Sequence, residues 1–264
     1  PFRISAVAVK ALQSRAYLYK GYWANTVLAS NYVISNSPVG LYDGKYTDIF
    51  SGGKESLWQL HYNVTENLAS TSLHSTYGTV DNGARDAEGF GDGTGAGDAQ
   101  LSVTADFMDL IDQEKDTRFQ ALRKVHYYGQ DLWWTTKFNS WGGVFGLDDI
   151  PLLRISEVYL NRAEAYAHQT SYTLARNDLN LLMNKRGLAN TDVSNSELLD
   201  EILLQRRIEL AFEGHRFFDM KRLGRDIPRA NGMAAIPYED YRVVAPISTT
   251  EMDVNKELVN NPGY

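Results

Sequence analysis

The apolar residues of segment 151–225 recur every three or four positions, a spacing typical of helices that bury one face. The first such face begins with Leu152, Ile155 and Tyr159. Pro151 precedes it, and a first helical turn tolerates proline because the missing N–H would have no partner there. The pattern therefore predicts a helix that starts at about residue 152.

Two further helices are expected in this segment, so that it forms three consecutive helices. A helix over 174–186 should end at Arg186 and Gly187, because glycine readily adopts the left-handed conformation that closes a helix. The next should begin near Ser194, which has the spacing of a capping box with Glu197.

The third of these helices carries charge where apolar residues are expected. Arg206 and Glu209 lie on or beside the row of Leu203 and Leu210. Because a buried charge needs a partner, we expect an internal ion-pair network. Its predicted members are Arg206, Arg207, Glu209, Glu213, Arg216 and Asp219. The alternative, a catalytic pair of Glu209 and Glu213, is weaker because acids four residues apart among arginines are mostly structural.

The start of the chain predicts another helix pair, over residues 4–19 and 22–35, separated by Gly21. The motif R-A-x-x-Y at Arg15 recurs at Arg162. Small and aromatic residues at this spacing are typical of tetratricopeptide-like helix pairs, in which two helices approach closely. The copies lie far apart in the sequence, so a large insertion must separate them.

That insertion is expected to contain a strand, a short helix and a long loop. Residues 104–111 predict the helix, and Asp116 with Arg118 predicts a local ion pair. Residues 78–98 are rich in Gly and Asp and lack periodicity, which predicts a loop. The strand, with one buried face, is predicted by the alternating residues Trp58, Leu60, Tyr62 and Val64.

No cofactor is expected, with one alternative. Asp86, Asp92 and Asp98 of the loop could hold Ca²⁺, which prefers clustered oxygen ligands, but their spacing differs from the EF-hand pattern and a solvated loop is the simpler interpretation. The five histidines show no metal-ligand spacing, and the chain has no cysteine.

The densest aromatic stretch of the chain, residues 126–141, is the expected ligand-binding region. Trp133 and Trp134 point to opposite sides of an extended chain, so only one can face the core. Sugar rings present apolar C–H faces that stack on aromatic rings, while amides and carboxylates bind the hydroxyl groups. The candidate ligand-binding residues are Trp133, Trp134, Trp141, Tyr127, Tyr128, Tyr77, Asn139 and Asp131.

The composition is that of a globular protein, with 43% hydrophobic and 22% charged residues. A net charge of −7 argues against nucleic acid as a partner, because nucleic-acid-binding proteins concentrate positive charge. No Ser-His-Asp order or H-E-x-x-H motif indicates catalysis, and we expect no enzyme.

Three segments together resemble the C-terminal part of the SusD/RagB family of outer-membrane nutrient-binding lipoproteins. They are LLRISEVYLNRAEAYA, RRIELAFEGHRFFDMKRLGR and the tail APISTTEMDVNKELVNNPGY. One departure is Gln205, where the family more often has Glu, which would remove one member of the ion network.

The resemblance implies a mainly α fold, with a tetratricopeptide-like scaffold and an irregular, partly β insertion. It also implies a lipid-anchored protein on the outer face of the outer membrane of Bacteroidota that captures oligosaccharides for a SusC-like, TonB-dependent transporter. A lipid anchor and an N-terminal helical half that also contributes to binding would then lie outside this sequence. The expected parts are a helix pair (1–36), the ligand-binding insertion (37–150), C-terminal helices (151–225) and an irregular tail (226–264).

Three alternatives stay open. A peptide-binding member of the same family would use a deeper polar cavity instead of an aromatic platform. A glycoside hydrolase would need two facing carboxylates beside the aromatics, for which Asp131, Asp148 and Asp149 are the candidates. A structural adaptor would need neither.

Overall fold

A computed structural model describes residues 3–264 apart from 79–100, 128–129, 139–143, 145 and 231. The chain groups into two compact units, Pro1–Phe212 and Glu213–Tyr264. The division into four functional parts by sequence stays a prediction.

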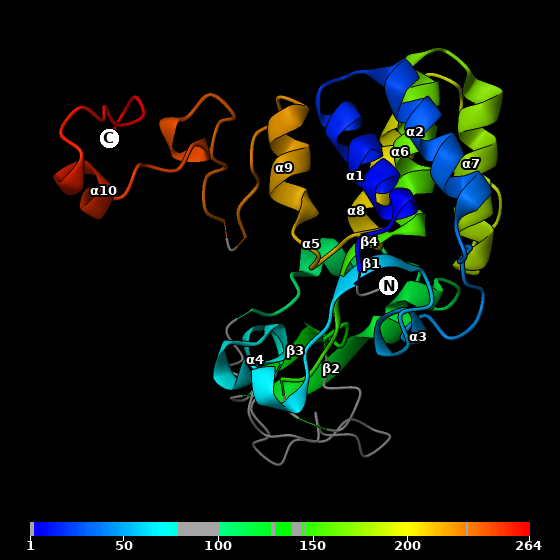
Figure 1. The fold of residues 1–264 in the computed structure, drawn as a ribbon. Helices are drawn as coiled ribbons and strands as arrows, with labels where there is room; N and C mark the ends of the chain where they lie inside the picture. The colour runs from blue at the N-terminus through cyan, green and yellow to red at the C-terminus, as the bar shows by residue number, and fades with distance from the viewer. Residues whose placement is uncertain (1–2, 79–100, 128–129, 139–143, 145, 231) are drawn as a thin grey trace. The chain divides into compact units, whose positions relative to one another are not determined.

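Helix pairs build the scaffold of the first unit. α1 (Ala6–Tyr19) packs on α2 (Trp23–Asn36), α6 (Ile155–His168) packs on α7 (Tyr172–Lys185), and α2 lies against α6. α8 (Leu198–Glu209) covers α6 and α7. Figure 1 shows these helices side by side, with β1 and β4 directly next to them and β2 and β3 farther away. The prediction of a mainly helical fold is confirmed.

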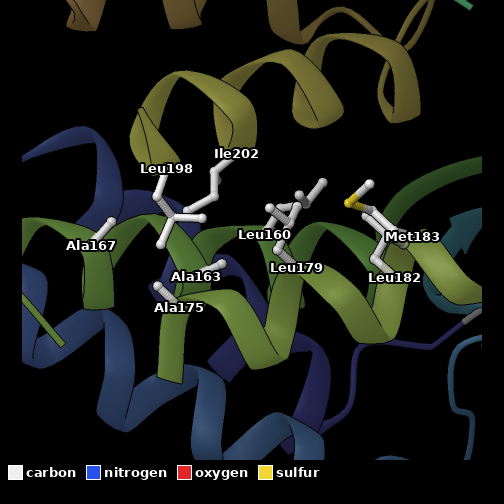
Figure 2. Packing of buried hydrophobic residues seen from close by; sticks show 9 residues of the cluster. All are labelled: Leu160, Ala163, Ala167, Ala175, Leu179, Leu182, Met183, Leu198 and Ile202. Atoms are coloured by element: carbon white, nitrogen blue, oxygen red, sulfur yellow. The ribbon is translucent and has the colours of Figure 1, made fainter. Parts of the chain in front are cut away.

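Small residues let the helices of the second pair approach closely. Ala163 of α6 and Ala175 of α7 are fully buried. Leu198 and Ile202 of α8 point toward them and toward Leu160 in Figure 2. Burying each Leu or Ile side chain contributes about 1.5–3 kcal/mol, so this cluster is a main source of stability for the scaffold.

The predicted helix ends at the two glycines are confirmed. Gly187 has a φ of +78°, and the N–H of Leu188 donates to the carbonyl of Met183. Gly21 has a φ of +71° after α1, and the N–H of Tyr22 donates to the carbonyl of Tyr17 in the same way. Both are Schellman ends, in which the left-handed residue satisfies carbonyls that the helix leaves unpaired.

Two predicted helix starts are wrong. β4 (Ile150–Arg154) is a strand, so α6 begins at Ile155 and not at 152. The chain stays extended there because β4 pairs with β1 (Ser56–Leu60), and the N–H of Ile155 donates to the carbonyl of Glu55 at 3.0 Å. α8 begins at Leu198, after a turn in which the Glu197 carboxylate accepts from Ser194.

The last predicted helix is also divided. It ends at Glu209 and resumes as α9 (His215–Arg222), after a turn with positive φ at Phe212 (66°) and Gly214 (81°). A non-glycine residue rarely adopts such a φ. The apolar residues continue through this turn, so their pattern did not indicate the break.

The predicted face of the first strand is wrong. Leu57 and Gln59 are buried, whereas Leu60 is exposed and Val64 lies in a 3₁₀ turn, η1 (Val64–Glu66). The β1–β4 register shifts on both sides of Trp58. A one-residue shift moves side chains to the other face of a sheet.

The remaining strands form a hairpin. β2 (Leu122–Tyr127) pairs antiparallel with β3 (Gln130–Thr135), which sets Trp133 opposite Lys124 and Trp134 opposite Arg123. The other short elements are α3 (Asp48–Ser51), η2 (Ala69–Thr71), α4 (Leu73–Tyr77), α5 (Ala105–Met108) and η3 (Thr117–Ala121). The local ion pair of Asp116 and Arg118 is confirmed, at 2.7 Å.

The second unit contains little regular structure. After α9 come η4 (Tyr241–Val243) and α10 (Thr249–Val254). A bridge joins Ile227 to Ile236, and Lys221 Nζ donates to the carbonyl of Val243 at 3.2 Å.

Candidate functional site

Two glutamates and two arginines form a buried ionic centre in the first unit. Arg154 Nη1 lies 3.2 Å from Glu55 Oε2 and 2.9 Å from Glu209 Oε1. Arg186 Nη2 lies 2.7 Å from Glu55 Oε1, and its Nε lies 3.0 Å from Glu209 Oε2. The centre joins the starts of β1 and α6 to the ends of α7 and α8, and its two positive charges balance its two negative charges.

The electrostatics of Glu209 follow from this arrangement. Burial alone would raise the pKa of its carboxyl, but the guanidinium groups of Arg186 and Arg154 hold that pKa well below its usual range. Its backbone carbonyl also accepts hydrogen bonds from Lys137 Nζ at 2.9 Å and Tyr46 Oη at 3.3 Å. An acid that is ionised, buried and fully bonded has a structural role.

Gln205 belongs to the surroundings of this centre. Its Oε1 accepts from Arg118 Nη2 at 2.6 Å, and its Nε2 donates to Glu201 at 2.9 Å. The uncharged side chain of Gln205 thus links Arg118 to Glu201 through hydrogen bonds.

The six residues predicted to form one network lie in both units. Arg206 Nη1 donates to Oδ1 of Asn161 at 2.7 Å, and Asp219 pairs with Arg222 of its own helix at 2.8 Å. The members in the first unit are Arg206, Arg207 and Glu209, and those in the second are Glu213, Arg216 and Asp219. A single network of these six stays a prediction. Sequence reasoning missed Glu55, Arg154 and Arg186, whose positions in unrelated elements gave no local signal.

The two arginines of the internal repeat hold neighbouring helices together. Arg15 of α1 pairs with Glu157 of α6 at 2.6 Å, and Arg162 of α6 pairs with Asp178 of α7 at 2.7 Å. Arg162 also donates to Asn31 of α2 at 2.6 Å. Both copies of the repeat motif therefore supply an arginine that joins two helices of the scaffold.

The two adjacent tryptophans of the predicted ligand site differ in exposure. Trp134 is 3% exposed, so its indole presents no face to a ligand in this structure. Trp133 is half-buried and lies against Phe119, with ring centroids 5.2 Å apart. The expectation that only one of the two can be a core residue is too simple, because Trp133 also packs on an apolar cluster around Phe107.

The other predicted ligand residues do not form one described cluster. Tyr77 stacks on Phe138 at 5.9 Å, and burial raises the pKa of its phenol. Asp131 is exposed and pairs with Lys124 at 2.8 Å. Tyr128, Asn139 and Trp141 lie outside the described residues, and so does the side chain of Tyr127. The assignment of these residues to a ligand site stays a prediction.

A small hollow lies where β1 ends and β4 begins. We call it the sheet-end hollow. Its lining includes Tyr62, Leu68, Ser72, Leu73, Asp148 and Ile150, together with His74 and Gly146. None of these described lining residues is Lys or Arg.

Hydrogen bonds fix the residues behind this hollow. Gln59 Nε2 donates to Asp149 Oδ2 at 2.7 Å, and His61 Nδ1 lies 2.7 Å from Asp149 Oδ1. Sequence reasoning considered Asp148 and Asp149 only as hydrolase candidates and read Tyr62 as a strand residue, so it did not find this site. Their convergence depends on the β1–β4 pairing, which the sequence does not show.

A second small hollow lies beside the ionic centre. Its lining is mostly apolar and includes Phe107, Ile111 and Leu122. Lys137 also lines it, but its ammonium group bonds the backbone carbonyls of Glu209 and Ala211, each at 2.9 Å.

In the described part of the chain, no group of three or more His, Asp or Glu residues could hold a metal ion. Asp86, Asp92 and Asp98 lie outside it. Of the helices in the described ranges, none has the length and apolar character needed to cross a bilayer.

Comparison with solved structures defines the class of protein: a helical scaffold shared by SusD-like proteins. A SusD superfamily protein from Bacteroides thetaiotaomicron VPI-5482 is 27% identical, with a TM-score of 0.83 over 99% of this chain and 61% of its own. A SusD-like carbohydrate binding protein from Bacteroides vulgatus ATCC 8482 is 24% identical, with a TM-score of 0.76 over 97% and 60%. A laminarin binding SusD-like protein is 22% identical, with a TM-score of 0.73 over 99% and 63%.

The sequence profile of the SusD family matches residues 111–264. The chain belongs to the SusD family. It spans 60–63% of the length of the three solved structures above. No curated protein matches it.

Proposed function

We propose that this protein is a non-enzymatic glycan-binding component of a nutrient-uptake system. It captures oligosaccharides on the outer face of the outer membrane, where a lipid anchor holds it, and delivers them to a SusC-like, TonB-dependent transporter. Membership of the SusD family carries this proposal. The likeness to a laminarin binding and a carbohydrate binding relative supports it.

The carboxylates beside the aromatic residues support binding over hydrolysis. A glycosidase needs one protonated and one free carboxyl group facing each other across the scissile bond. Asp131 instead forms an exposed ion pair with Lys124, and both carboxylate oxygens of Asp149 have hydrogen-bond partners in Gln59 and His61. Such carboxylates act as acceptors that fix geometry.

Isothermal titration calorimetry tests ligand capture. The full-length gene product, without its lipid, would be titrated with plant, host and microbial oligosaccharides and with a peptide mixture. Saturable heat with one glycan class and no hydrolysis products by chromatography are the expected results. Heat with peptides alone would assign the protein to the peptide-binding branch of the family, and cleavage of the glycan would make it an enzyme.

The transporter partner needs a separate test. Affinity-tagged protein purified from mildly solubilised outer membranes of its host should bring down one large β-barrel protein in a stable ratio. Recovery without any such protein, under conditions that keep a known transporter pair together, would contradict the delivery step.

A further inference from the structure

We propose that the outer side of α1 is the docking site for a further helix pair, supplied by the part of the full-length protein that lies outside this sequence. The inference goes beyond the proposed function and does not depend on it. The docking site is a row of three exposed residues, Val9, Leu12 and Ala16, which lie about one turn apart on one side of the helix. We call this row the open face.

The open face is neutral and apolar. Val9 is 40% exposed and Leu12 is 43% exposed. In α1 and α2, all of whose residues the structure describes, no exposed residue carries a charge, and residues 4–42 contain no Asp or Glu. A helix at the surface of a globular protein normally turns charged and polar residues outward. An apolar row on the outside of a helix therefore indicates an interaction surface.

The internal repeat shows what happens to the same row in the other helix pair. The R-A-x-x-Y motif aligns Ala16 of α1 with Ala163 of α6, and the same offset aligns Val9 with Ser156. Ala163 and Ser156 are both fully buried, whereas Ala16 and Val9 are exposed. The row is thus covered in the second pair and open in the first.

The helix that lies along α6 on this side is α2. Tyr159, the equivalent of Leu12, is partly buried and packs on a cluster that includes Val33 of α2. Arg162 of the second motif donates to Asn31 of α2 at 2.6 Å. If the two copies pack alike, α1 receives the second helix of another pair in the way that α6 receives α2.

Stacked helix pairs also need closed ends, because each pair buries its core against a neighbour and terminal elements cover what is left. α8 covers α6 and α7 at one end of this array. This chain spans 60–63% of the length of the three solved relatives, so more than a third of each relative has no counterpart here. That length has room for another pair of helices like α1 and α2, of 14 residues each.

Thiol labelling tests whether the open face is covered. The sequence contains no cysteine, so Ala16→Cys places a single thiol on the face once any cysteine elsewhere in the full-length protein is replaced by serine. A buried thiol reacts only when the structure opens, so its reaction with DTNB should be about tenfold slower, or more, than that of Ala189→Cys. Ala189 is the matched control because it is an exposed alanine beyond the end of α7. Equal rates, at unaltered melting temperatures, would overturn the inference.

A charge on the open face gives a second readout in the full-length protein. Leu12→Lys should lower the melting temperature by about 5 °C or more, because the docked helix pair would strip water from the new charge. Leu181→Lys is the matched control, since Leu181 is a helical leucine of the other pair with a similar exposure of 48%. Equally small shifts in both variants would contradict docking on α1.

Two other occupants would give different labelling results. Protection of the Ala16→Cys thiol in purified protein at every protein concentration is the expected result. Protection that disappears on dilution would assign the face to a second copy of the chain, and protection that appears only in outer membranes containing the transporter would assign it to that partner. Either result would overturn the inference. None of these measurements uses a glycan, so their failure leaves the proposed function standing.

Discussion

Arg186 and Glu209 form a bidentate ion pair in the interior of the protein, although Arg186 follows α7 and Glu209 ends α8. Arg186 Nε donates to Glu209 Oε2 and its Nη2 donates to Oε1, both at 3.0 Å. Such paired hydrogen bonds fix the relative orientation of both groups. The ion pair therefore sets how the last helix of the first unit meets the helix pair before it.

Replacing Glu209 with Gln should destabilise the protein by about 3–5 kcal/mol, because Arg154 and Arg186 would share only the charge of Glu55 in a buried site. Urea unfolding followed by circular dichroism measures this change. Glu114→Gln removes an exposed acid as the control and should leave the urea midpoint near that of the wild type. A variant at Glu209 that is as stable as the wild type would show that the centre contributes nothing to stability.

Glu209 should also make stability depend on pH in acid. Its folded-state pKa lies well below the usual value of 4.5, so its contribution is present above pH 4.5 and disappears as the pH falls through the folded-state pKa. The difference in unfolding free energy between the wild type and Glu209→Gln should therefore be constant from pH 7 to about pH 5 and shrink below that. A difference that stays constant or widens in acid would contradict the assigned pKa direction.

The buried ionic centre shows what a sequence can and cannot predict. The row of apolar residues along α8 predicts that Arg206 and Glu209 lie on its buried face, and both side chains are buried. The partners of Glu209 come from β4 and from the end of α7, and no periodicity relates them to α8. Periodicity indicates which charges are buried, but only the packing of the helices shows which charges meet.

Gly187→Ala should be much more harmful than Gly21→Ala, although both glycines end helices with a similar positive φ. A Cβ at Gly187 would overlap the carbonyl oxygen of Lys115, and that loop is held by the bond from Thr117 N–H to the Arg186 carbonyl, 2.9 Å. For a Cβ at Gly21 the nearest atoms belong to the Trp23 side chain, at an ordinary 3.5 Å or more.

The cost at Gly21 should be about 1–2 kcal/mol, the price of a left-handed residue with a side chain, and the cost at Gly187 at least twice that. Thermal unfolding of both single variants gives the comparison. Equal shifts in melting temperature would mean that backbone conformation alone, without the contact to Lys115, accounts for the glycine at 187.

Arg162→Ala should destabilise the scaffold by about 2–4 kcal/mol, because Asp178 would remain buried without its partner. Burial already raises the pKa of Asp178, and Arg162 offsets part of that effect. Lys185→Ala removes the exposed pair with Asp43 and should lower the melting temperature far less, since exposed pairs contribute little. Similar losses for the two variants would contradict a special role for the repeated arginine.

The candidate ligand region was predicted less well than the scaffold, for a physical reason. Helices can be predicted from periodicity over many residues. The sheet-end hollow instead forms because β1 and β4, which lie far apart in the sequence, pair and bring Tyr62 and Asp148 into one lining. Aromatic density indicated residues 126–141 as the ligand-binding region but did not predict the β2–β3 hairpin. It could not show that Trp134 would be buried.

Trp134→Ala should cost about 3–5 kcal/mol, as expected for removing a large buried side chain, and Trp133→Ala clearly less, because Trp133 is only half-buried. Melting temperatures of the two single variants measure the difference, and the Phe variant at each position should recover part of each loss by refilling the space. A double replacement would confound folding with ligand binding, so glycan titrations belong to the single variants whose melting temperature is close to wild type. If Trp133→Ala proved the more destabilising of the two, the assignment of Trp134 as the core residue of the hairpin would be wrong.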